Sequence, residues 1–449
     1  MIDAYATATA TGMVAALAAR EVSAVELASA AIEHIERLDP PINAVVVRDF
    51  ERALEAARSA DEALARGERR PLLGLPMTVK EAHNVAGLPT TWGSEAFKDW
   101  IAPADSVGVA RLKAAGAIIL GKTNVPPFLS DWQSANPVYG RTNHPLDPKR
   151  TPGGSSGGGA AALAAGMVPL EFGSDIGGSI RVPAAFCGVY GHKPSHELIP
   201  QRGHAPPGLE GAGVELNVVG PMARSVDDLE LALSILAGPD EDRAVAYRLE
   251  LPTPRHNRLA DYRVLIIDSH PIAALDSEIH GALDGFAGEI ERAGATVARR
   301  SDLMPDLAEG FAAYAALLMP IVTRGTPAQP QAASAHDWMR ALDVQWAFRR
   351  RWATLFKTFD VVVAPVFGVV AFEHQIGDFD SRTHVIDGKV TPYRDQVAWP
   401  AIATLANLPA TAVPIGVTRT GLPIGAQIVG PYLEDLTTLA FARLVSGRN

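Results

Sequence analysis

Residues 151–195 read TPGGSSGGGAAALAAGMVPLEFGSDIGGSIRVPAAFCGVYGHKPS, and the rest of the chain is organised around them. Two serines lie among glycines, Ser155 in GGSSGGG and Ser179 in DIGGSIR. Glycine lets the backbone approach a ligand closely and adopt dihedral angles that other residues avoid. The alanine-rich segment 160–168, which separates the serines, is strongly helix-forming. We therefore interpret the stretch as a rigid site that presents two hydroxyl groups, and not as a flexible linker.

The composition of the 449 residues excludes several classes of protein. A net charge of −10 gives no basic footprint, which argues against nucleic acid as a partner. The single cysteine, Cys187, permits no disulfide within the chain and no cysteine-based metal site. The first twenty residues lack the basic start of a signal peptide, and no apolar run approaches the ~18 residues of a membrane span. We therefore expect a cytoplasmic protein without a membrane association.

Hydrophobic periodicity predicts strands that alternate with helices. The predicted strands are 44–47, 77–80, 117–120, 263–267, 297–299, 359–365 and two apolar strands joined by a turn at 418–421. The predicted helices are 5–20, 23–38, 50–66, 107–115, 225–236, 277–293 and most of 304–356, with a turn at 220–224. This order predicts an α/β fold: a single α/β/α domain over 1–449, with a mixed, mostly parallel sheet covered by helices on both faces. Residues 70–235 would form the catalytic core, and the polar segment 237–261 a linker or surface excursion.

Two familiar motifs are present in the wrong context. GAIILGKT at 116–123 fits the phosphate-binding P-loop pattern, but its middle residues read as an apolar strand and prolines follow where a helix should start. GGSSG at 153–157 fits the nucleophile turn of α/β-hydrolases, but DPKRTP precedes it where a strand is required. No histidine stands in a convincing triad context, so the second motif is kept only as a minor alternative.

A lysine at the end of an apolar strand can activate one of the serines. A serine hydroxyl needs a base at neutral pH, and a lysine serves when burial keeps it neutral and no carboxylate pairs with it. Lys80 ends the segment MTVK, and Glu81 would point to the opposite face. The glycine turn at 176–179 offers consecutive backbone N–H groups to a developing oxyanion. Taken singly, these motifs equally fit a surface lysine and a tight turn.

Together the motifs resemble the amidase signature family of serine amide hydrolases. The resemblance covers most of the chain, through GLPMTVKE, LGKTNVP, GRTNHPLDPKRTPGGSSGG, FGSDIGGSIRVPAAFCGVYGHKPS, GPMARSVDDL, FDVVVAPV and GLPIGAQIVG. It implies that Lys80 is the catalytic lysine, Ser155 the bridging serine and Ser179 the nucleophile. It also implies a cis peptide bond before Ser155 and an oxyanion hole made of the backbone N–H groups of Ile176, Gly177, Gly178 and Ser179.

The resemblance implies a metal-independent amidase, without cofactor or metal ion, that cleaves a C–N bond through an acyl-enzyme. By their position in the family pattern, Leu129 and Trp132 should lie near the acyl pocket, which favours small hydrophobic or aryl amides, with esters and carbamates as further substrates. Asp175 and Arg181 are expected to brace the glycine turn. The alternative is a glutamine amidotransferase subunit that acts in a complex. The expected partner is a small-molecule amide, ester or carbamate, and a homodimer stays open.

One arginine-rich segment has two interpretations. Residues 338–351 contain Trp346 and several arginines, and would either cover the pocket or pack as a surface helix. We favour the packed helix.

Overall fold

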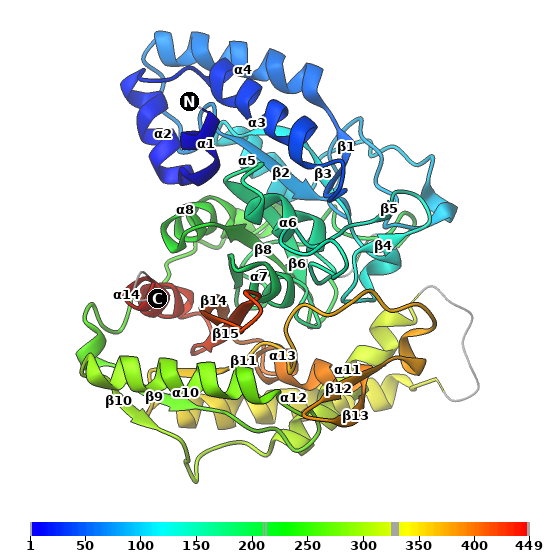
Figure 1. The fold of residues 1–449 in the computed structure, drawn as a ribbon, viewed down its shortest axis with the longest axis vertical. Helices are drawn as coiled ribbons and strands as arrows, with labels where there is room; N and C mark the ends of the chain where they lie inside the picture. Colours follow the sequence, from blue (N-terminus) through cyan, green and yellow to red (C-terminus); the bar gives the residue numbers. More distant parts are fainter. Residues whose placement is uncertain (1, 210, 212, 325–331, 447–449) are drawn as a thin grey trace.

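The computed structural model describes residues 2–209, 211, 213–324 and 332–446, and a mixed sheet of 11 strands runs through it (Figure 1). In their order across the sheet, the strands are β1 (Val45–Arg48), β3 (Ile118–Thr123), β2 (Pro76–Lys80), β6 (Leu170–Asp175), β8 (Val218–Ala223), β7 (Tyr190–Lys193), β14 (Ala410–Val417), β15 (Pro423–Val429), β11 (Val361–Pro365), β9 (Arg263–Ile266) and β10 (Thr296–Ala298).

Helices cover both faces of this sheet. Every residue of β2, β3, β6, β8, β11 and β15 is buried, and successive residues of a strand point to opposite faces. The helices are α1 (Ile2–Thr7), α2 (Ala10–Ala19), α3 (Ala24–Leu38), α4 (Phe50–Ala65), α5 (Val107–Ala114), α6 (Gly157–Ala164), α7 (Arg181–Cys187), α8 (Val226–Leu236), α9 (Glu241–Ala244), α10 (Ser277–Arg292), α11 (Leu307–Val322), α12 (Ala335–Leu355), α13 (Ala398–Thr404) and α14 (Asp435–Val445).

The mixed α/β sheet is confirmed, but it contains more antiparallel strand pairs than parallel ones. Six strand pairs in the described part of the chain are antiparallel and four are parallel, so the sheet is not mostly parallel. Five of the antiparallel pairs involve β8, β14 or β15. The reason is that β8 and the β14–β15 hairpin insert into the middle of the sheet instead of extending its edges.

Local sequence signals explain several of the helix boundaries. Ser23 opens α3 with a capping box, in which Ser23 Oγ accepts from the Glu26 N–H at 3.1 Å and the Glu26 carboxylate accepts from the Ser23 N–H at 2.8 Å. The predicted helix 5–20 is divided into α1 and α2, because the Thr9 hydroxyl caps the start of α2 by accepting from the Gly12 N–H.

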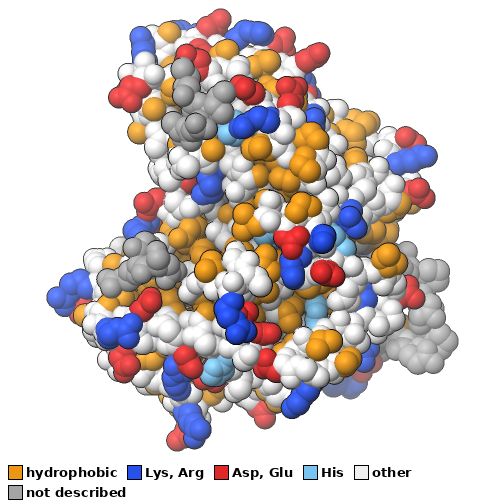
Figure 2. All heavy atoms as spheres, viewed as in Figure 1, with side chains coloured by type: hydrophobic (Ala, Val, Ile, Leu, Met, Phe, Trp, Pro, Cys, Tyr) orange, Lys and Arg blue, Asp and Glu red, His pale blue; other side chains and the backbone are white. Residues whose placement is uncertain are grey.

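Smaller elements complete the chain. Two short hairpins lie outside the main sheet, β4 (Ala135–Asn136) with β5 (Gly140–Arg141), and β12 (Thr383–Ile386) with β13 (Lys389–Pro392). Segment 237–261 runs largely exposed between α8 and β9 and contains the short helix α9. Acidic and basic side chains are interspersed over the face seen in Figure 2. Among the residues with described structure, no helix is both long and apolar enough to cross a membrane.

The topology brings the sequence motifs to one edge of the sheet. β2 and β6 are parallel neighbours, with Val79 paired to Phe172, so their carboxyl ends lie side by side. Lys80 is the last residue of β2, and the glycine turn at 176–179 follows Asp175, the last residue of β6. Such an edge is where open α/β sheets place their ligands.

Candidate active site

Lys80 is fully buried and faces two serines. Its Nζ donates to Ser155 Oγ at 2.7 Å and to Ser174 Oγ at 2.9 Å. Burial lowers the pKa of the Lys80 ammonium to about 7, against the opposing charges of Asp175 and Glu171. A substantial fraction of Lys80 is therefore uncharged near neutral pH and able to accept a proton.

Glu81, the next residue, is directed away from this lysine. One Glu81 oxygen accepts from the Thr91 N–H at 2.5 Å and from the Tyr139 hydroxyl at 3.1 Å, and the other accepts from the Trp92 N–H at 3.0 Å. The Glu81 charge is thus engaged by the loop after β2, as expected for the opposite face of the strand. It leaves Lys80 without a carboxylate partner at hydrogen-bond distance within the described structure.

A second buried acid, Glu171, lies below the site in β6. It accepts a hydrogen bond from the Thr123 hydroxyl at 2.6 Å and a short one from the Thr78 hydroxyl, so it links β6 to β2 and β3. Burial raises the pKa of Glu171 to about 7, although these two hydroxyl groups oppose the change. Glu171 therefore contributes only part of a negative charge near Lys80 at neutral pH.

Ser155 follows a cis peptide bond, Gly154–Ser155, as the family resemblance implied. Gly154 packs against the loop that carries Asp131 and Trp132. A Cβ at position 154 would lie 2.5 Å from the Asp131 carbonyl oxygen, so a side chain does not fit there. The glycine is required by this close approach, which holds Ser155 at the start of α6.

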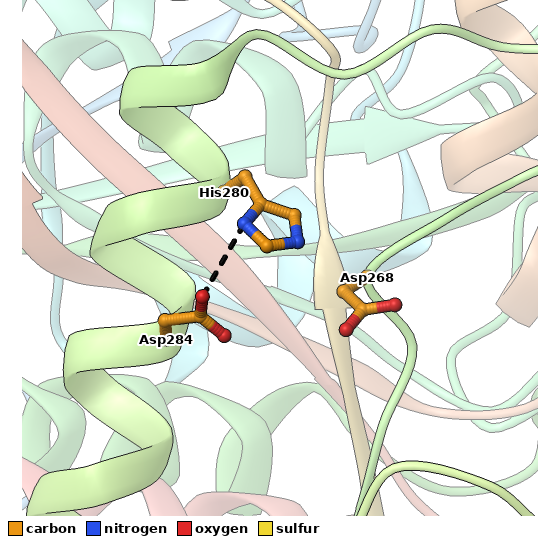
Figure 3. Close-up of side chains that lie close together, drawn as sticks. All are labelled: Asp268, His280 and Asp284. Atoms are coloured by element: carbon orange, nitrogen blue, oxygen red, sulfur yellow. Dashed lines mark ion pairs between the residues drawn. The ribbon is translucent and has the colours of Figure 1, made fainter.

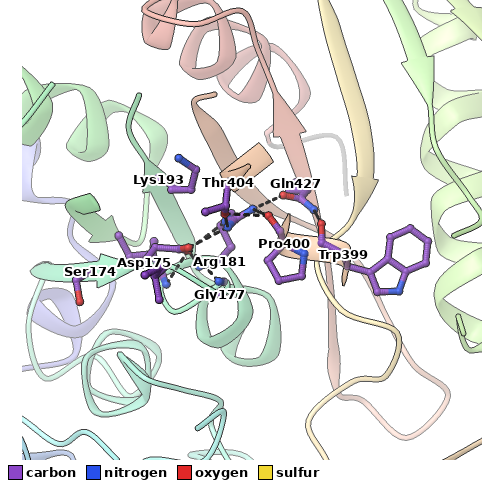
Figure 4. Close-up of polar contacts among 12 residues, drawn as sticks. Ser174, Asp175, Gly177, Arg181, Lys193, Trp399, Pro400, Thr404 and Gln427 are labelled. Carbon is purple, nitrogen blue, oxygen red and sulfur yellow. Dashed lines mark hydrogen bonds and ion pairs between the residues drawn. The ribbon is translucent and has the colours of Figure 1, made fainter. Parts of the chain in front are cut away.

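Asp175 and Arg181 brace the glycine turn (Figure 4). The Asp175 carboxylate accepts from the N–H groups of Gly178 at 2.9 Å and Ile180 at 3.1 Å, and from two nitrogens of Arg181 at 2.9 and 3.0 Å. Burial raises the pKa of Asp175, but the charge and hydrogen bonds of Arg181 outweigh it and lower the pKa to about 2. Arg181 also reaches distant parts of the chain by donating to Pro400 O, Thr404 Oγ1 and Gln427 Oε1.

Three donors hold the carbonyl groups of the turn. The Tyr314 hydroxyl donates to Ile176 O at 3.0 Å, the Trp132 indole donates to Gly177 O at 3.0 Å, and the Val182 N–H donates to Gly178 O at 2.6 Å. In a trans peptide the N–H points away from the C=O of the same unit. Fixing the three carbonyls therefore also fixes the directions of the N–H groups of Gly177, Gly178 and Ser179.

The N–H groups of the turn are not equivalent. Gly178 donates to Asp175 and is already engaged, whereas the N–H groups of Ile176, Gly177 and Ser179 have no acceptor among the described residues. The Ser179 hydroxyl likewise has no hydrogen-bond partner in the described part of the chain, and its residue is 6% exposed. Ser179 O accepts from the Ser156 N–H at 3.1 Å, which places Ser179 beside the residue that follows Ser155.

This arrangement combines a buried amine, two serines and unpaired N–H groups at one edge of a mixed sheet. The sequence matches the Amidase family over residues 26–320 and 306–439, which include every residue of the site described above. The chain belongs to the amidase signature family. Its α/β fold and its central mixed sheet are those of that family.

Known members of the amidase signature family resemble the chain over nearly its full length. A glutamyl-tRNA(Gln) amidotransferase subunit of Methylococcus capsulatus is 32% identical over 468 residues, which cover 94% of this chain and 93% of the relative. A structure described as "An unexpected vestigial protein complex reveals the evolutionary origins of an s-triazine catabolic enzyme" is 30% identical, with a TM-score of 0.83 and 98% of each chain covered. A bacterial aryl acylamidase, 24% identical with a TM-score of 0.84 over 98% of this chain and 95% of its own, shares the fold.

Two side chains of this amidase signature chain were expected near the acyl pocket. Trp132 is 4% exposed, and its ring packs against Phe367, Phe379 and Tyr393 at centroid distances of 4.9, 5.4 and 5.2 Å. Its indole N–H donates to Gly177 O in the glycine turn, a hydrogen bond that the sequence does not predict. Leu129 is half-buried and adopts a left-handed backbone conformation with φ 60°.

One further cluster has metal-ligand chemistry. Asp268, His280 and Asp284 lie together at the surface, where α10 faces the segment after β9 (Figure 3). Arg299 pairs with Asp284 at 2.7 Å and with Asp268 at 3.2 Å, so it already engages both carboxylates and offsets part of their charge. The cluster lies on α10 and on the segment after β9, a strand remote from β2 and β6 in the sheet order, and it makes no hydrogen bond to Lys80.

Proposed function

We propose that this amidase signature hydrolase cleaves the C–N bond of small hydrophobic or aryl amides through an acyl-enzyme on Ser179. The observation that carries the proposal is the buried hydrogen bond of 2.7 Å between Lys80 Nζ and Ser155 Oγ, with the pKa of Lys80 lowered to about 7. A base with a pKa near the working pH transfers protons efficiently in both directions. Lys80 is therefore the proposed base, Ser155 the proposed relay and Ser179 the proposed nucleophile.

The proposed reaction begins when neutral Lys80 accepts the proton of Ser155, which in turn accepts the proton of Ser179. Ser179 Oγ forms a bond to the carbonyl carbon, and the carbonyl oxygen takes the negative charge. The free N–H groups of Ile176, Gly177 and Ser179 would stabilise that charge. The C–N bond breaks as the leaving amine takes a proton through Ser155. Water then repeats the sequence on the acyl-enzyme, releasing the acid and restoring Ser179.

We propose an uncharged acyl group, because the residues assigned to the acyl pocket by the family pattern are apolar. These are Leu129 and Trp132, whose ring packs in an aromatic group and whose indole bonds to Gly177 O, and an apolar wall binds alkyl or aryl groups better than charged ones. Esters and carbamates present the same carbonyl carbon to the nucleophile, so we propose them as further substrates. The identity of the leaving group is not selected by the Lys80–Ser155–Ser179 arrangement.

A second candidate function is glutamine amidotransferase activity within a complex. The 32% identity to the amidotransferase subunit of Methylococcus capsulatus supports it. Glutamine would need a cation for its α-carboxylate and an anion for its α-amino group. Beside Gly154, Arg382 and Asp131 form a charged pair with each other, and Asp131 also accepts from the Tyr393 hydroxyl at 2.8 Å. Because these charges are already paired, we favour the free-standing hydrolase.

A substrate panel tests the proposal. The purified chain is assayed with an aryl amide, an aliphatic amide, an ester, a carbamate and L-glutamine, with and without a chelator, and Ser179→Ala serves as the inactive control. Rapid release of the amine from the aryl amide, unaffected by the chelator and absent in the variant, supports a free-standing hydrolase. Turnover of L-glutamine and of no other substrate in the panel, or activity only after a partner protein is added, favours the second function. Loss of amide turnover with the chelator contradicts the metal-independent mechanism.

A further inference from the structure

A hollow lies beside the carboxyl-terminal half of α12. Its volume is about 630 Å³, and its walls come from α12, from Arg255 and from the segment that follows β15. None of its lining residues belongs to the Lys80–Ser155–Ser179 site. A hollow of this size is typical of a binding site for a small molecule.

The face of α12 that borders the hollow carries one ring and two cations. Trp346, Arg349 and Arg350 line the hollow at spacings of three and four residues, which place side chains on one side of a helix. Phe356 and Lys357, which follow the last residue of α12, also line it. The opposite side of α12 enters the core through Phe348 and Trp352, each 2% exposed. α12 is therefore a packed helix, as we favoured from the sequence, but Trp346 is 52% exposed and free to contact a ligand.

The Arg349 guanidinium lies close to two aromatic rings. Its guanidinium carbon lies 4.3 Å from the ring centre of Trp346 and 4.2 Å from that of Tyr432. Its Nε is buried and has no hydrogen-bond partner among the residues the structure describes. Because this Nε is buried by the protein, Arg349 contributes its charge and its ring contacts to the wall of the hollow.

The hollow also carries uncompensated positive charge. Arg255 is neutralised, since it pairs with Glu434 at 2.6 Å and also donates to Phe356 O, just beyond the end of α12, at 2.7 Å. Arg349, Arg350 and Lys357, in contrast, have no carboxylate within ion-pair distance in the described chain. Three cations therefore face one hollow in a protein whose net charge is −10. Such a local excess attracts anions.

We propose that this hollow binds a small organic anion that carries a planar ring. The ring would stack on the exposed indole of Trp346, and the anionic group would accept from Arg350 and Lys357, with the charge of Arg349 nearby. Nucleoside monophosphates and aryl carboxylates share this chemistry. The site is separate from the hydrolytic one, so the proposal does not depend on the substrate of Ser179.

Calorimetric titration of the full chain at low salt tests the proposal with four probes: AMP, 2-naphthoate, adenosine and inorganic phosphate. We expect saturable binding of one AMP or one 2-naphthoate per chain, and the tighter of the two identifies the source class. Adenosine, which lacks the charge, and phosphate, which lacks the ring, should each bind at least about tenfold more weakly. If neither ring-bearing anion binds, the proposal is wrong.

Variants locate the binding. Arg350→Gln combined with Lys357→Gln should weaken binding at least about tenfold, and Trp346→Ala should do the same by removing the stacking surface. Lys98→Gln removes an exposed positive charge elsewhere and should bind like the wild type. Amide turnover and the melting temperature should be unchanged in the double variant. Undiminished binding by the double variant would place the ligand at another site and overturn the proposal.

Discussion

Replacing Tyr314 with phenylalanine should slow the reaction without unfolding the protein. Tyr314 is fully buried in α11, and its hydroxyl donates to Ile176 O at 3.0 Å. That bond fixes the peptide unit whose other end is the N–H of Gly177, one of the three free donors proposed for the oxyanion. Tyr314→Phe removes only this hydroxyl and leaves the ring, so no cavity of the size of a side chain is formed.

The structure sets the size of the effect. Loss of one hydrogen bond costs about 1 kcal/mol of stability, and more where the acceptor stays buried. Complete removal of an oxyanion donor lowers kcat by about 10²–10³-fold. Tyr314→Phe keeps the Gly177 donor and only loosens its direction, so a smaller loss is expected. We predict a fall in kcat of about tenfold, equivalent to about 1.4 kcal/mol of transition-state stabilisation, with KM little changed.

Steady-state kinetics with an aryl amide and a thermal melt check this prediction together. Tyr247→Phe is the matched control, because the Tyr247 side chain is 66% exposed and its hydroxyl has no hydrogen-bond partner in the described structure. The control should keep wild-type kcat. A lowered melting temperature with unchanged kcat would show that the Tyr314 hydroxyl serves stability alone. An increase in KM with constant kcat would equally refute the positioning of the oxyanion donors.

Three further predictions concern the same site. Ser179→Ala should lower amide turnover by at least about 10³-fold while the circular dichroism spectrum stays native, and appreciable residual turnover would point to another nucleophile. The charged form of Lys80 cannot accept a proton, and the pKa of Lys80 is lowered to about 7. The value of kcat/KM should therefore fall about tenfold per pH unit below pH 7 and level off above it. A pH profile with its maximum on the acid side would contradict this prediction. Arg181→Met should lower the free energy of unfolding in urea by about 3–5 kcal/mol, because it leaves the buried carboxylate of Asp175 without its counter-charge. A decrease below about 1 kcal/mol would mean that the pair is not essential to the fold.

The sequence predicts elements better than it predicts their arrangement. Apolar periodicity located β9, β11, α10 and the β14–β15 hairpin, because each has its own local pattern. β8 was missed, since Gly220 and Pro221 are typical of a turn. Pro221 is tolerated because β7 pairs with β8 only at Met222 and Ala223, which leaves the backbone of Pro221 with one neighbouring strand. The insertion of β14 and β15 beside β7 depends on tertiary pairing that no local pattern encodes.

The residues of the candidate site also divide into those that the sequence predicts and those that only the structure reveals. The contact of Lys80 with Ser155 and the bracing role of Asp175 follow from the motifs and the family resemblance. Tyr314 could not be found, because 138 residues separate it from Ile176 and its helix is otherwise an ordinary apolar one. Glu171 gave a weak signal, as an acidic residue inside an apolar strand. The indole bond from Trp132 required the three-dimensional position of its ring.

The bond between Arg181 and Gln427 spans 246 positions, so Arg181 gains all its partners only after the chain has been made past residue 427. A chain that has left the ribosome only as far as residue 390 already contains Lys80, Ser155 and Ser179. It still lacks the carbonyl, hydroxyl and amide groups that hold Arg181, and with them the support of the turn beside the nucleophile. Such a nascent chain should be inert toward amides. Cutting the gene within segment 237–261 should accordingly yield two silent fragments that gain activity only when they are produced together and associate.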